Sequence, residues 1–373
     1  MEHQPLPPSS EADKPQLRLV SDVPLLGNQE SFTDLARIIK NPTVNQPLET
    51  RKHGQLNHEL AIMEDGDAYP ITTATPKHSR SDTAIVFTTA WLTSTRGHNR
   101  HTMLRLMQLG YPVIMIGPEG EVRSPELTRK ERFEHALHSD MYKIVHDMNR
   151  ILDAKLPAEK LRENEIIVLG ESRAAMTGFG LDVPQFSGRR RAAYTDLTAP
   201  CFARPPKLEE LPDIALQLVP EGLTLVKLGF KLFGKRLRHY GATLHDDPEY
   251  YFKELLKVPQ LMSGKAGSLA MATRVETPTH IRDFTKDGWS QTDEWPDMLG
   301  HKHTSRIELA HGYHLDIADP ATLRNQEHRL DALAEARGFD GSFDGIGFNA
   351  IMEAHLIRQN RSRPVGKTVL RVA

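Results

Sequence analysis

The stretch that decides the fold reads Glu165-Ile-Ile-Val-Leu-Gly170-Glu-Ser172-Arg-Ala174-Ala-Met-Thr-Gly-Phe-Gly180. Its apolar start is typical of a strand buried inside a parallel sheet. The strand leads directly into the pattern G-x-S-x-A, and the small residues that follow predict a helix over 173–180. A sharp strand-to-helix turn exposes the serine hydroxyl above the sheet. Gly170 and Ala174 supply the small residues that such a turn needs, because the backbones of strand and helix come very close there.

Ser172 allows two interpretations. An ordinary tight turn would use the serine only to cap the helix. The buried strand before it and the small-residue helix after it favour a nucleophile instead. The same turn aims the backbone N–H of Arg173 at the position where an oxyanion would develop, and the helix N-terminus reinforces this effect.

Strand and helix patterns alternate on both sides of this stretch. Apolar runs predict buried strands at 84–88, 111–116, 165–169, 191–195, 279–284 and 305–309, and a short strand pair at 60–63 and 70–74. Helical spacing predicts helices at 31–40, 99–109, 124–154, 173–180 and 320–337, with Ser124 or Thr128 as the N-cap of the segment at 124–154. This alternation indicates an α/β fold, with a mostly parallel sheet covered by helices on both faces. The alternation stops at 201–275, where the sequence shows helical patterns only, and this segment is therefore predicted to form a helical cap.

The domain organisation follows from these patterns. We expect a disordered or arm-like tail at 1–28, an α/β core formed by 29–200 and 276–373, and the cap at 201–275. The chain has 373 residues and a formal net charge of −2, which argues against a nucleic-acid partner. Its single cysteine, Cys201, excludes an intramolecular disulfide and a Cys-ligated zinc cluster. Without a signal-peptide pattern or an apolar run of about 18 residues, we expect a cytoplasmic protein.

With these motifs in place, the chain resembles the α/β-hydrolase superfamily over about residues 83–337, including the position of the cap. The resemblance implies a second oxyanion donor in the loop after the first buried strand, which reads Thr88-Thr-Ala-Trp91-Leu92. Thr89 and Ala90 stand where the family usually has His-Gly. Trp91 is therefore the expected donor, through its backbone N–H, and Leu92 is the alternative.

The resemblance also implies a catalytic histidine after the last parallel strand. His314, in Gly312-Tyr-His314 and followed by Asp319-Pro320, fits the family pattern best. His311 lies closer to the end of the strand and is the alternative base.

The acid is expected after the penultimate strand, where Asp287 is followed by Gly288 at the strand's carboxyl end. Asp196, at the end of the strand before the cap, is the alternative. Asp283 lies within the strand at 279–284, and Asp293 could equally cap the next helix. The order Ser172, Asp287, His314 is the one that this fold demands.

The resemblance implies a serine hydrolase that cleaves a carboxylic ester on a small molecule through an acyl-enzyme. His314 would take the proton of Ser172, and Asp287 would orient the imidazole. No metal or organic cofactor is required. The same triad serves an acyltransferase, thioesterase or amidase, and a non-catalytic binding or structural protein that retains the fold is the third interpretation.

The spacing of apolar and basic residues predicts a basic amphipathic helix at 222–241, within the expected cap. Its apolar face carries Val226, Phe230, Phe233 and Leu237, and its basic face carries Lys227, Lys231, Lys235 and Arg238. One interpretation is a lid that presents apolar surface to a lipophilic acyl chain or makes transient contact with a membrane surface. The other is a helix packed on its neighbours. The sequence leaves the oligomeric state open.

Overall fold

The computed structural model describes residues 17–21, 53–79, 84–88, 103–104, 106–117, 124–128, 130–131, 134–135, 141–156, 166–182, 192–201, 207–212, 277, 279–285, 287, 289–290, 306–310, 314 and 369–372. The predicted helices at 31–40 and 320–337, and most of the predicted cap, lie outside these residues. Within the described ranges, no helix has both the length and the apolar character needed to cross a membrane.

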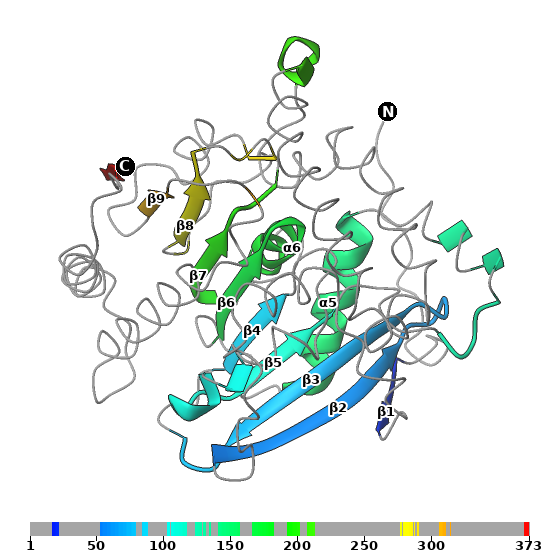
Figure 1. The fold of residues 1–373 in the computed structure, drawn as a ribbon. Helices are drawn as coiled ribbons and strands as arrows, with labels where there is room; N and C mark the ends of the chain where they lie inside the picture. The colour runs from blue at the N-terminus through cyan, green and yellow to red at the C-terminus, as the bar shows by residue number, and fades with distance from the viewer. Residues whose placement is uncertain are drawn as a thin grey trace, which may run out of the picture.

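The described strands form one ten-stranded sheet in the order β1-β2-β3-β5-β4-β6-β7-β8-β9-β10 (Figure 1). The strands are β1 (Arg18–Ser21), β2 (Gly54–Ile62), β3 (Ala68–Pro76), β4 (Ala84–Thr88), β5 (Val113–Ile116), β6 (Ile166–Glu171), β7 (Ala192–Thr198), β8 (Thr279–Phe284), β9 (Arg306–Ala310) and β10 (Val369–Val372). The strands from β5 to β9 are parallel to one another. The edges, β1–β3 on one side and β10 on the other, are antiparallel. The mostly parallel α/β sheet expected from the sequence is confirmed.

The central strands lie close to their expected positions. Strands β4 and β8 have the expected bounds, whereas β7 continues three residues further than the apolar run, to Thr198. The predicted strand pair is a longer hairpin, formed by β2 and β3. Two edge strands were not predicted. Strand β1 falls inside the expected tail and pairs with β2, and β10 pairs with β9 at the other edge.

The apolar core has a layer on each face of the sheet. On one face, alternate residues such as Val86 and Val168 pack against the helices α5 (Met141–Lys155) and α6 (Arg173–Asp182). On the other face, Phe87 and Leu169 pack with Met103, Leu106 and Met107. Because both faces are covered, β4, β5 and the start of β6 are nearly continuous apolar runs, which is the pattern that predicted them from the sequence.

Of the two N-caps expected for the helical segment at 124–154, Thr128 is confirmed and Ser124 is wrong. Residues 124–128 are not helical, whereas 130–131, 134–135 and α5 (Met141–Lys155) are. The hydroxyl of Ser124 donates to the backbone oxygen of Gly66 at 2.5 Å and accepts from the amide of Glu126 at 3.2 Å. A serine side chain that bonds nearby backbone groups competes with helix formation.

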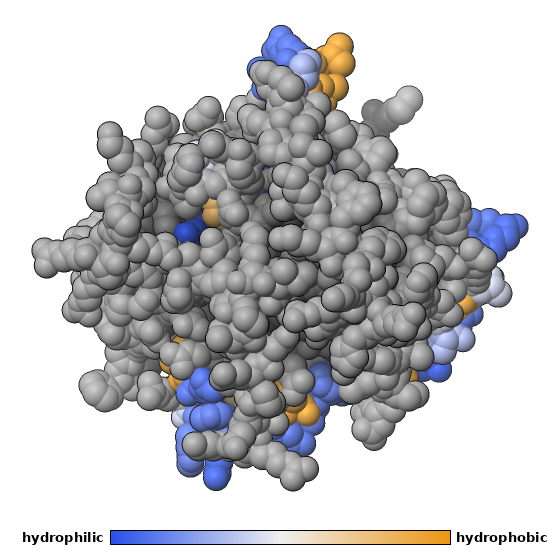
Figure 2. Space-filling model, in the orientation of Figure 1, coloured by the Kyte–Doolittle hydropathy of each residue, from blue (hydrophilic) through white to orange (hydrophobic). Residues whose placement is uncertain are grey.

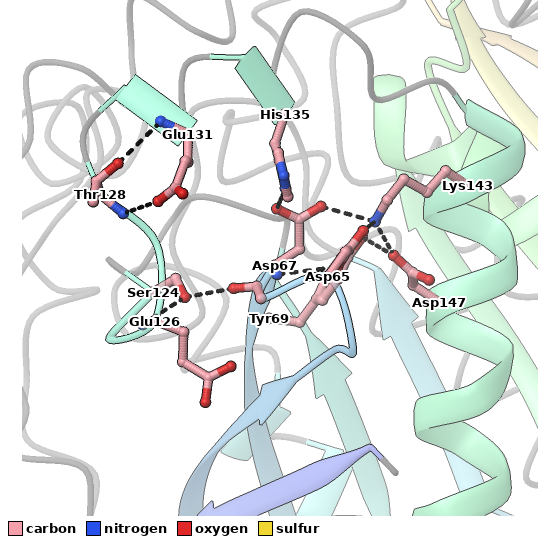
Figure 3. A network of polar contacts seen from close by, with 11 residues as sticks. Asp65, Asp67, Tyr69, Ser124, Glu126, Thr128, Glu131, His135, Lys143 and Asp147 are labelled. Atoms are coloured by element: carbon pink, nitrogen blue, oxygen red, sulfur yellow. Dashed lines mark hydrogen bonds and ion pairs between the residues drawn. The ribbon is translucent and has the colours of Figure 1, made fainter. Parts of the chain in front are cut away.

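A helical segment starts instead at Thr128. The Thr128 amide donates to the Glu131 carboxylate at 2.8 Å, and the Glu131 amide donates to the Thr128 hydroxyl at 3.3 Å (Figure 3). This exchange is a capping box, which satisfies two amide groups at a helix start. The described residues that follow, 130–131 and 134–135, are helical.

A partly buried ionic cluster ties the β2–β3 turn to the first turns of α5 (Figure 3). The ammonium of Lys143 lies 2.9 Å from Asp65, 2.8 Å from Asp67 and 2.6 Å from Asp147. The hydroxyl of Tyr69 donates to Asp147 at 2.9 Å. Burial lowers the pKa of Lys143, but the charges of Asp147 and Asp67 outweigh it, so the pKa is raised above its ordinary value. The cluster therefore carries a permanent cation among carboxylates.

Only a small part of the predicted cap is described. It includes the short helix η4 (Leu208–Glu210), which stands out from the rest of the chain at the top of Figure 1. Leu208 is 84% exposed. Figure 2 shows hydrophobic surface beside hydrophilic surface at this segment.

Candidate active site

Ser172 occupies the turn between β6 and α6 and has a left-handed backbone conformation, with φ of 56°. Such a conformation is costly for a residue with a side chain and is typical of functional sites. A Cβ atom on Gly170 would lie 2.7 Å from the Cα of Ala175. Only glycine fits at this position, because the strand and the helix pass too close for any side chain.

Hydrogen bonds from the neighbouring strands hold this turn in place. The Ser172 amide donates to the backbone oxygen of Thr198, the last residue of β7, at 2.9 Å. From the other side, the Thr88 hydroxyl at the end of β4 donates to the Ala174 oxygen at 2.8 Å and lies 3.2 Å from the Leu169 oxygen. The serine therefore lies at the carboxyl edge of the parallel strands, where open α/β sheets bind their ligands.

His314 connects Ser172 to Asp287. Its Nε2 atom lies 2.7 Å from Ser172 Oγ, and its Nδ1 atom lies 2.7 Å from Asp287 Oδ2. An ionised carboxylate only accepts hydrogen bonds, so Nδ1 carries the proton and Nε2 is free to accept from the serine hydroxyl. Three residues distant in the sequence thus form a continuous chain of hydrogen bonds, in which His314 can accept the proton of Ser172.

The Asp287 carboxylate is held from both sides. Asp287 follows β8, and its backbone amide donates to the Phe284 oxygen at 3.0 Å. One carboxylate oxygen contacts His314 and the other accepts from the Trp289 amide at 2.8 Å. The Asp287 side chain has no exposed surface. These hydrogen bonds stabilise the negative charge of the carboxylate, which lies directly beside the imidazole ring.

The electrostatics of the site stabilise the imidazolium that forms once His314 has accepted a proton. Burial lowers the pKa of His314, but the charge of Asp287, its hydrogen bond and a smaller contribution from Cys201 outweigh burial. The pKa of His314 is raised well above its ordinary value. The ring is therefore a strong proton acceptor.

Solved structures of low sequence identity share this architecture. An esterase from Pyrobaculum calidifontis matches with a TM-score of 0.51 at 14% identity, over 81% of this chain and 90% of the esterase. Epoxide hydrolase I from potato (Solanum tuberosum) matches with a TM-score of 0.51 at 12% identity, over 75% of this chain and 100% of the hydrolase. The chain has the α/β-hydrolase fold. No protein-family model matches the sequence, and no curated protein is significantly similar to it.

Two further acidic residues of this chain, Asp196 and Asp283, lie on β7 and β8. Both contact groups other than His314. Asp196 lies on β7, where its carboxylate is 3.7 Å from the Nδ1 atom of His280 on the adjacent strand. Asp283 accepts from the Phe284 amide at 2.8 Å and from the hydroxyl of Ser290. Among the described residues, the carboxylate in contact with His314 is that of Asp287.

Four sequence candidates lie outside the described residues: His311, Asp293, Trp91 and Leu92. Arg173 is described through its backbone, as the first residue of α6 directly after Ser172. The oxyanion donors therefore stay predictions.

Sequence reasoning missed one residue of the site, Cys201. Its thiol sulfur lies 3.6 Å from Ser172 Oγ, and its side chain is buried. In the sequence analysis, a single cysteine served only to exclude an intramolecular disulfide and a Cys-ligated zinc cluster. Its place just beyond the carboxyl end of a parallel strand is the signal that could have pointed to the site.

One group of described side chains has the chemistry of metal ligands: Asp65, Asp67 and His135. His135 Nδ1 lies 3.0 Å from Asp67 Oδ1. The ammonium of Lys143 contacts both carboxylates and supplies the positive charge there. The group is thus part of the ionic cluster between the β2–β3 turn and α5.

Proposed function

We propose that the chain is a serine hydrolase that cleaves carboxylic esters, with Ser172 as nucleophile, His314 as general base and Asp287 as the acid that orients it. The observation that carries the proposal is the pair of 2.7 Å contacts, Ser172 Oγ to His314 Nε2 and His314 Nδ1 to Asp287 Oδ2. A nucleophile in reach of a base, itself oriented by a third group, is the arrangement that activates a hydroxyl.

The reaction proceeds in two halves. His314 takes the Ser172 proton while Oγ attacks the ester carbonyl, and the protonated imidazole then gives that proton to the departing alcohol. A water molecule, activated by the same histidine, hydrolyses the acyl-enzyme. Asp287 stabilises the imidazolium in both halves, in keeping with the raised pKa of His314.

Backbone N–H groups are proposed to bind the negative oxygen of the intermediate. One is that of Arg173, at the N-terminus of α6, where the helix dipole favours negative charge. The other is that of Trp91, in the loop after β4. Losing one such donor typically costs about 10²- to 10³-fold in turnover.

The proposed substrate is a small-molecule ester with a lipophilic acyl group. The esterase from Pyrobaculum calidifontis supports ester chemistry on this fold. The apolar face of the predicted cap helix, which includes Phe230 and Phe233, supports an apolar acyl pocket. Each buried methylene contributes about 0.8 kcal/mol. Efficiency should then rise about 3- to 4-fold per added CH₂ until the pocket is full.

A fluorophosphonate probe tests the proposal directly, because it labels only activated serines. The wild-type chain should be labelled at Ser172 and should hydrolyse p-nitrophenyl esters. Ser172→Ala should abolish labelling and lower turnover by about 10³-fold or more. Ser124→Ala is the matched control, since Ser124 is also buried but bonds the Gly66 backbone. Full esterase activity in Ser172→Ala would sink the proposal.

The acyl preference is tested separately, with p-nitrophenyl esters from acetate to octanoate. Phe230→Asp should flatten the rise with chain length more than it lowers acetate turnover. A wild-type preference for acetate over all longer chains would remove the lipophilic substrate and leave the hydrolase proposal standing.

A further inference from the structure

The Cys201 thiol contacts the nucleophile from outside the proposed triad. Its sulfur lies 3.6 Å from Ser172 Oγ, and its side chain is buried. We propose that Cys201 is a positioning residue that holds the Ser172 hydroxyl in its reactive orientation. The proposal rests on the hydrolase function proposed above and adds a residue to its machinery.

The backbone around Cys201 is bent in a way that brings the thiol to the serine. Among the described residues other than glycine, only Ser172 and Ala199 have a positive φ, and Ala199 has a φ of 46°. Both residues are buried, and they lie beside the same strand ends. Strained conformations persist only where surrounding structure enforces them, and they cluster at functional sites. Here one strained residue presents the nucleophile and the other turns the chain toward it.

Hydrogen bonds from both neighbouring strands enforce this second bend. The Thr198 oxygen accepts from the Ser172 amide at 2.9 Å. The Ala199 amide donates to the Arg282 oxygen on β8 at 2.6 Å. The segment that carries Cys201 is therefore fastened to the serine turn on one side and to the strand that precedes Asp287 on the other. These two backbone hydrogen bonds hold the positive φ of Ala199 in place and fix the position of Cys201 relative to Ser172.

The chemistry of the two groups is complementary. A serine hydroxyl has one proton to donate and lone pairs to accept with, and a thiol is a weak donor. In the resting site, the Ser172 proton points to His314 Nε2, so a lone pair of Oγ is available to the Cys201 S–H. Without this second contact, the hydroxyl is freer to leave the reactive rotamer for another staggered position.

Cys201 also acts on the base. Ser172 and Asp287 each lie 2.7 Å from a ring nitrogen of His314, and the ring centroid of Trp289 lies 6.3 Å from that of His314. Burial lowers the pKa of His314, and Cys201 raises it in the same direction as Asp287. Removing the thiol should therefore weaken the base as well as loosen the nucleophile.

The test compares Cys201→Ala with Cys201→Ser, since a hydroxyl retains the hydrogen bond. The readouts are the rate of fluorophosphonate labelling of Ser172 and the kinetics of p-nitrophenyl acetate across pH. We expect Cys201→Ala to lower the labelling rate and kcat by about 3- to 10-fold, with KM little changed. The acid limb of the kcat/KM profile should move to lower pH. Cys201→Ser should restore most of the rate.

Val145→Ala is the control for a small core void, because Val145 is fully buried in α5. It should lower the melting temperature and leave the acid limb in place. If Cys201→Ala fails to fold, Cys201→Val removes the hydrogen bond while filling the space, and it should show the same slow labelling.

Two results would overturn the positioning role. One is a wild-type labelling rate and an unmoved acid limb in Cys201→Ala. The other is a serine variant as slow as the alanine variant, because the hydrogen bond would then be irrelevant. If the proposed hydrolase function itself is wrong, the wild-type chain will not be labelled at Ser172, and the positioning role of Cys201 is then wrong as well.

Discussion

The hydroxyl of Thr88, at the end of β4, donates to the backbone oxygen of Ala174 in the first turn of α6 at 2.8 Å. The same hydroxyl lies 3.2 Å from the backbone oxygen of Leu169 in β6. Thr88 is fully buried. One side chain thus fastens the strand that precedes the proposed oxyanion loop to both sides of the serine turn.

Thr88→Val should therefore disturb the site more than the fold. Valine has the shape of threonine without the hydroxyl, so the expected loss of unfolding free energy is about 1–2 kcal/mol. A small displacement of the nucleophile costs up to about 10²-fold in rate. Fluorophosphonate labelling should fall by about 10-fold or more, whereas Thr88→Ser should keep near-normal labelling. Equal labelling in both variants would show that this contact does not position the turn.

Gly170→Ala and Gly178→Ala form a second matched pair. A Cβ on Gly170 would meet backbone atoms, 2.7 Å from Ala175 Cα and 3.2 Å from the Ala174 oxygen. We expect Gly170→Ala to cost about 2–3 kcal/mol of unfolding free energy and most of the activity.

A Cβ on Gly178, inside α6, would instead meet side-chain atoms of Val168 and Thr88, at 3.1 and 3.2 Å. Side chains can shift, and alanine is better than glycine in a helix by about 1 kcal/mol. Gly178→Ala should therefore be close to neutral in thermal or urea unfolding. The opposite ranking of the two variants would mean that the backbones at the serine turn are not as close as described.

The central part of the fold could be predicted because its strands are buried on both faces. Strands β4 and β8 are short runs rich in apolar or β-branched residues, a pattern that favours strands inside a parallel sheet. The far end of β7 could not be predicted in this way. Its last residues pair with β6 and β8 through the backbone, with Thr198 opposite Glu171 and Arg282. Because these last residues include polar side chains, the hydropathy pattern does not reveal that the strand continues.

The edges and the long-range contacts were beyond sequence reasoning. Strands β1 and β10 have four residues each and carry no distinctive pattern. The contact of Lys143 with Asp65, and that of Cys201 with Ser172, join residues far apart in the chain. Only the folded backbone brings such pairs together. Motif order could propose Ser172, Asp287 and His314, but the sequence left both Asp287 and Asp196 open as the acid.

Asp287→Asn should change the pH dependence of catalysis. The Asp287 charge helps to raise the pKa of His314 against the effect of burial, so its removal should lower that pKa. The acid limb of kcat/KM should move to lower pH. The plateau should fall by about 10³- to 10⁴-fold, because asparagine no longer stabilises the imidazolium or fixes its tautomer. An unchanged acid limb would argue against Asp287 as the partner of the base.

The same pair predicts a pH-dependent contribution to stability. A histidine whose pKa is raised in the folded state stabilises the fold fully below its unfolded pKa, near 6.5. The contribution is lost as the pH rises through the folded pKa. The difference in unfolding free energy between wild type and Asp287→Asn should therefore shrink as pH rises through the folded pKa of His314. Urea titrations at several pH values measure it, and a difference that grows with pH would contradict the sign.

Lys143→Met tests the ionic cluster at the β2–β3 turn. The Lys143 side chain is 29% exposed, whereas the Asp67 and Asp147 side chains are only 9% and 8% exposed. Removing the ammonium leaves these carboxylates without their cation, so the unfolding free energy should fall by about 2–4 kcal/mol. Lys130→Met is the control. Lys130 is 85% exposed and lies 3.7 Å from Glu134, so its loss should cost at most about 0.5 kcal/mol.

Acid titration separates this cluster from a simple packing effect. Burial raises the pKa of Asp65, but the hydrogen bond and charge of Lys143 outweigh it and lower the pKa. A lowered pKa gives stability that is present above the unfolded value, near 3.8, and lost as pH falls through the folded value. In Lys143→Met this loss should be smaller, so the two stability curves should converge in acid. The cluster and the proposed triad share no described residue, so folded Lys143→Met should still be labelled at Ser172. Parallel curves across the acid range would mean that Lys143 stabilises the turn through its aliphatic stem and not through its charge.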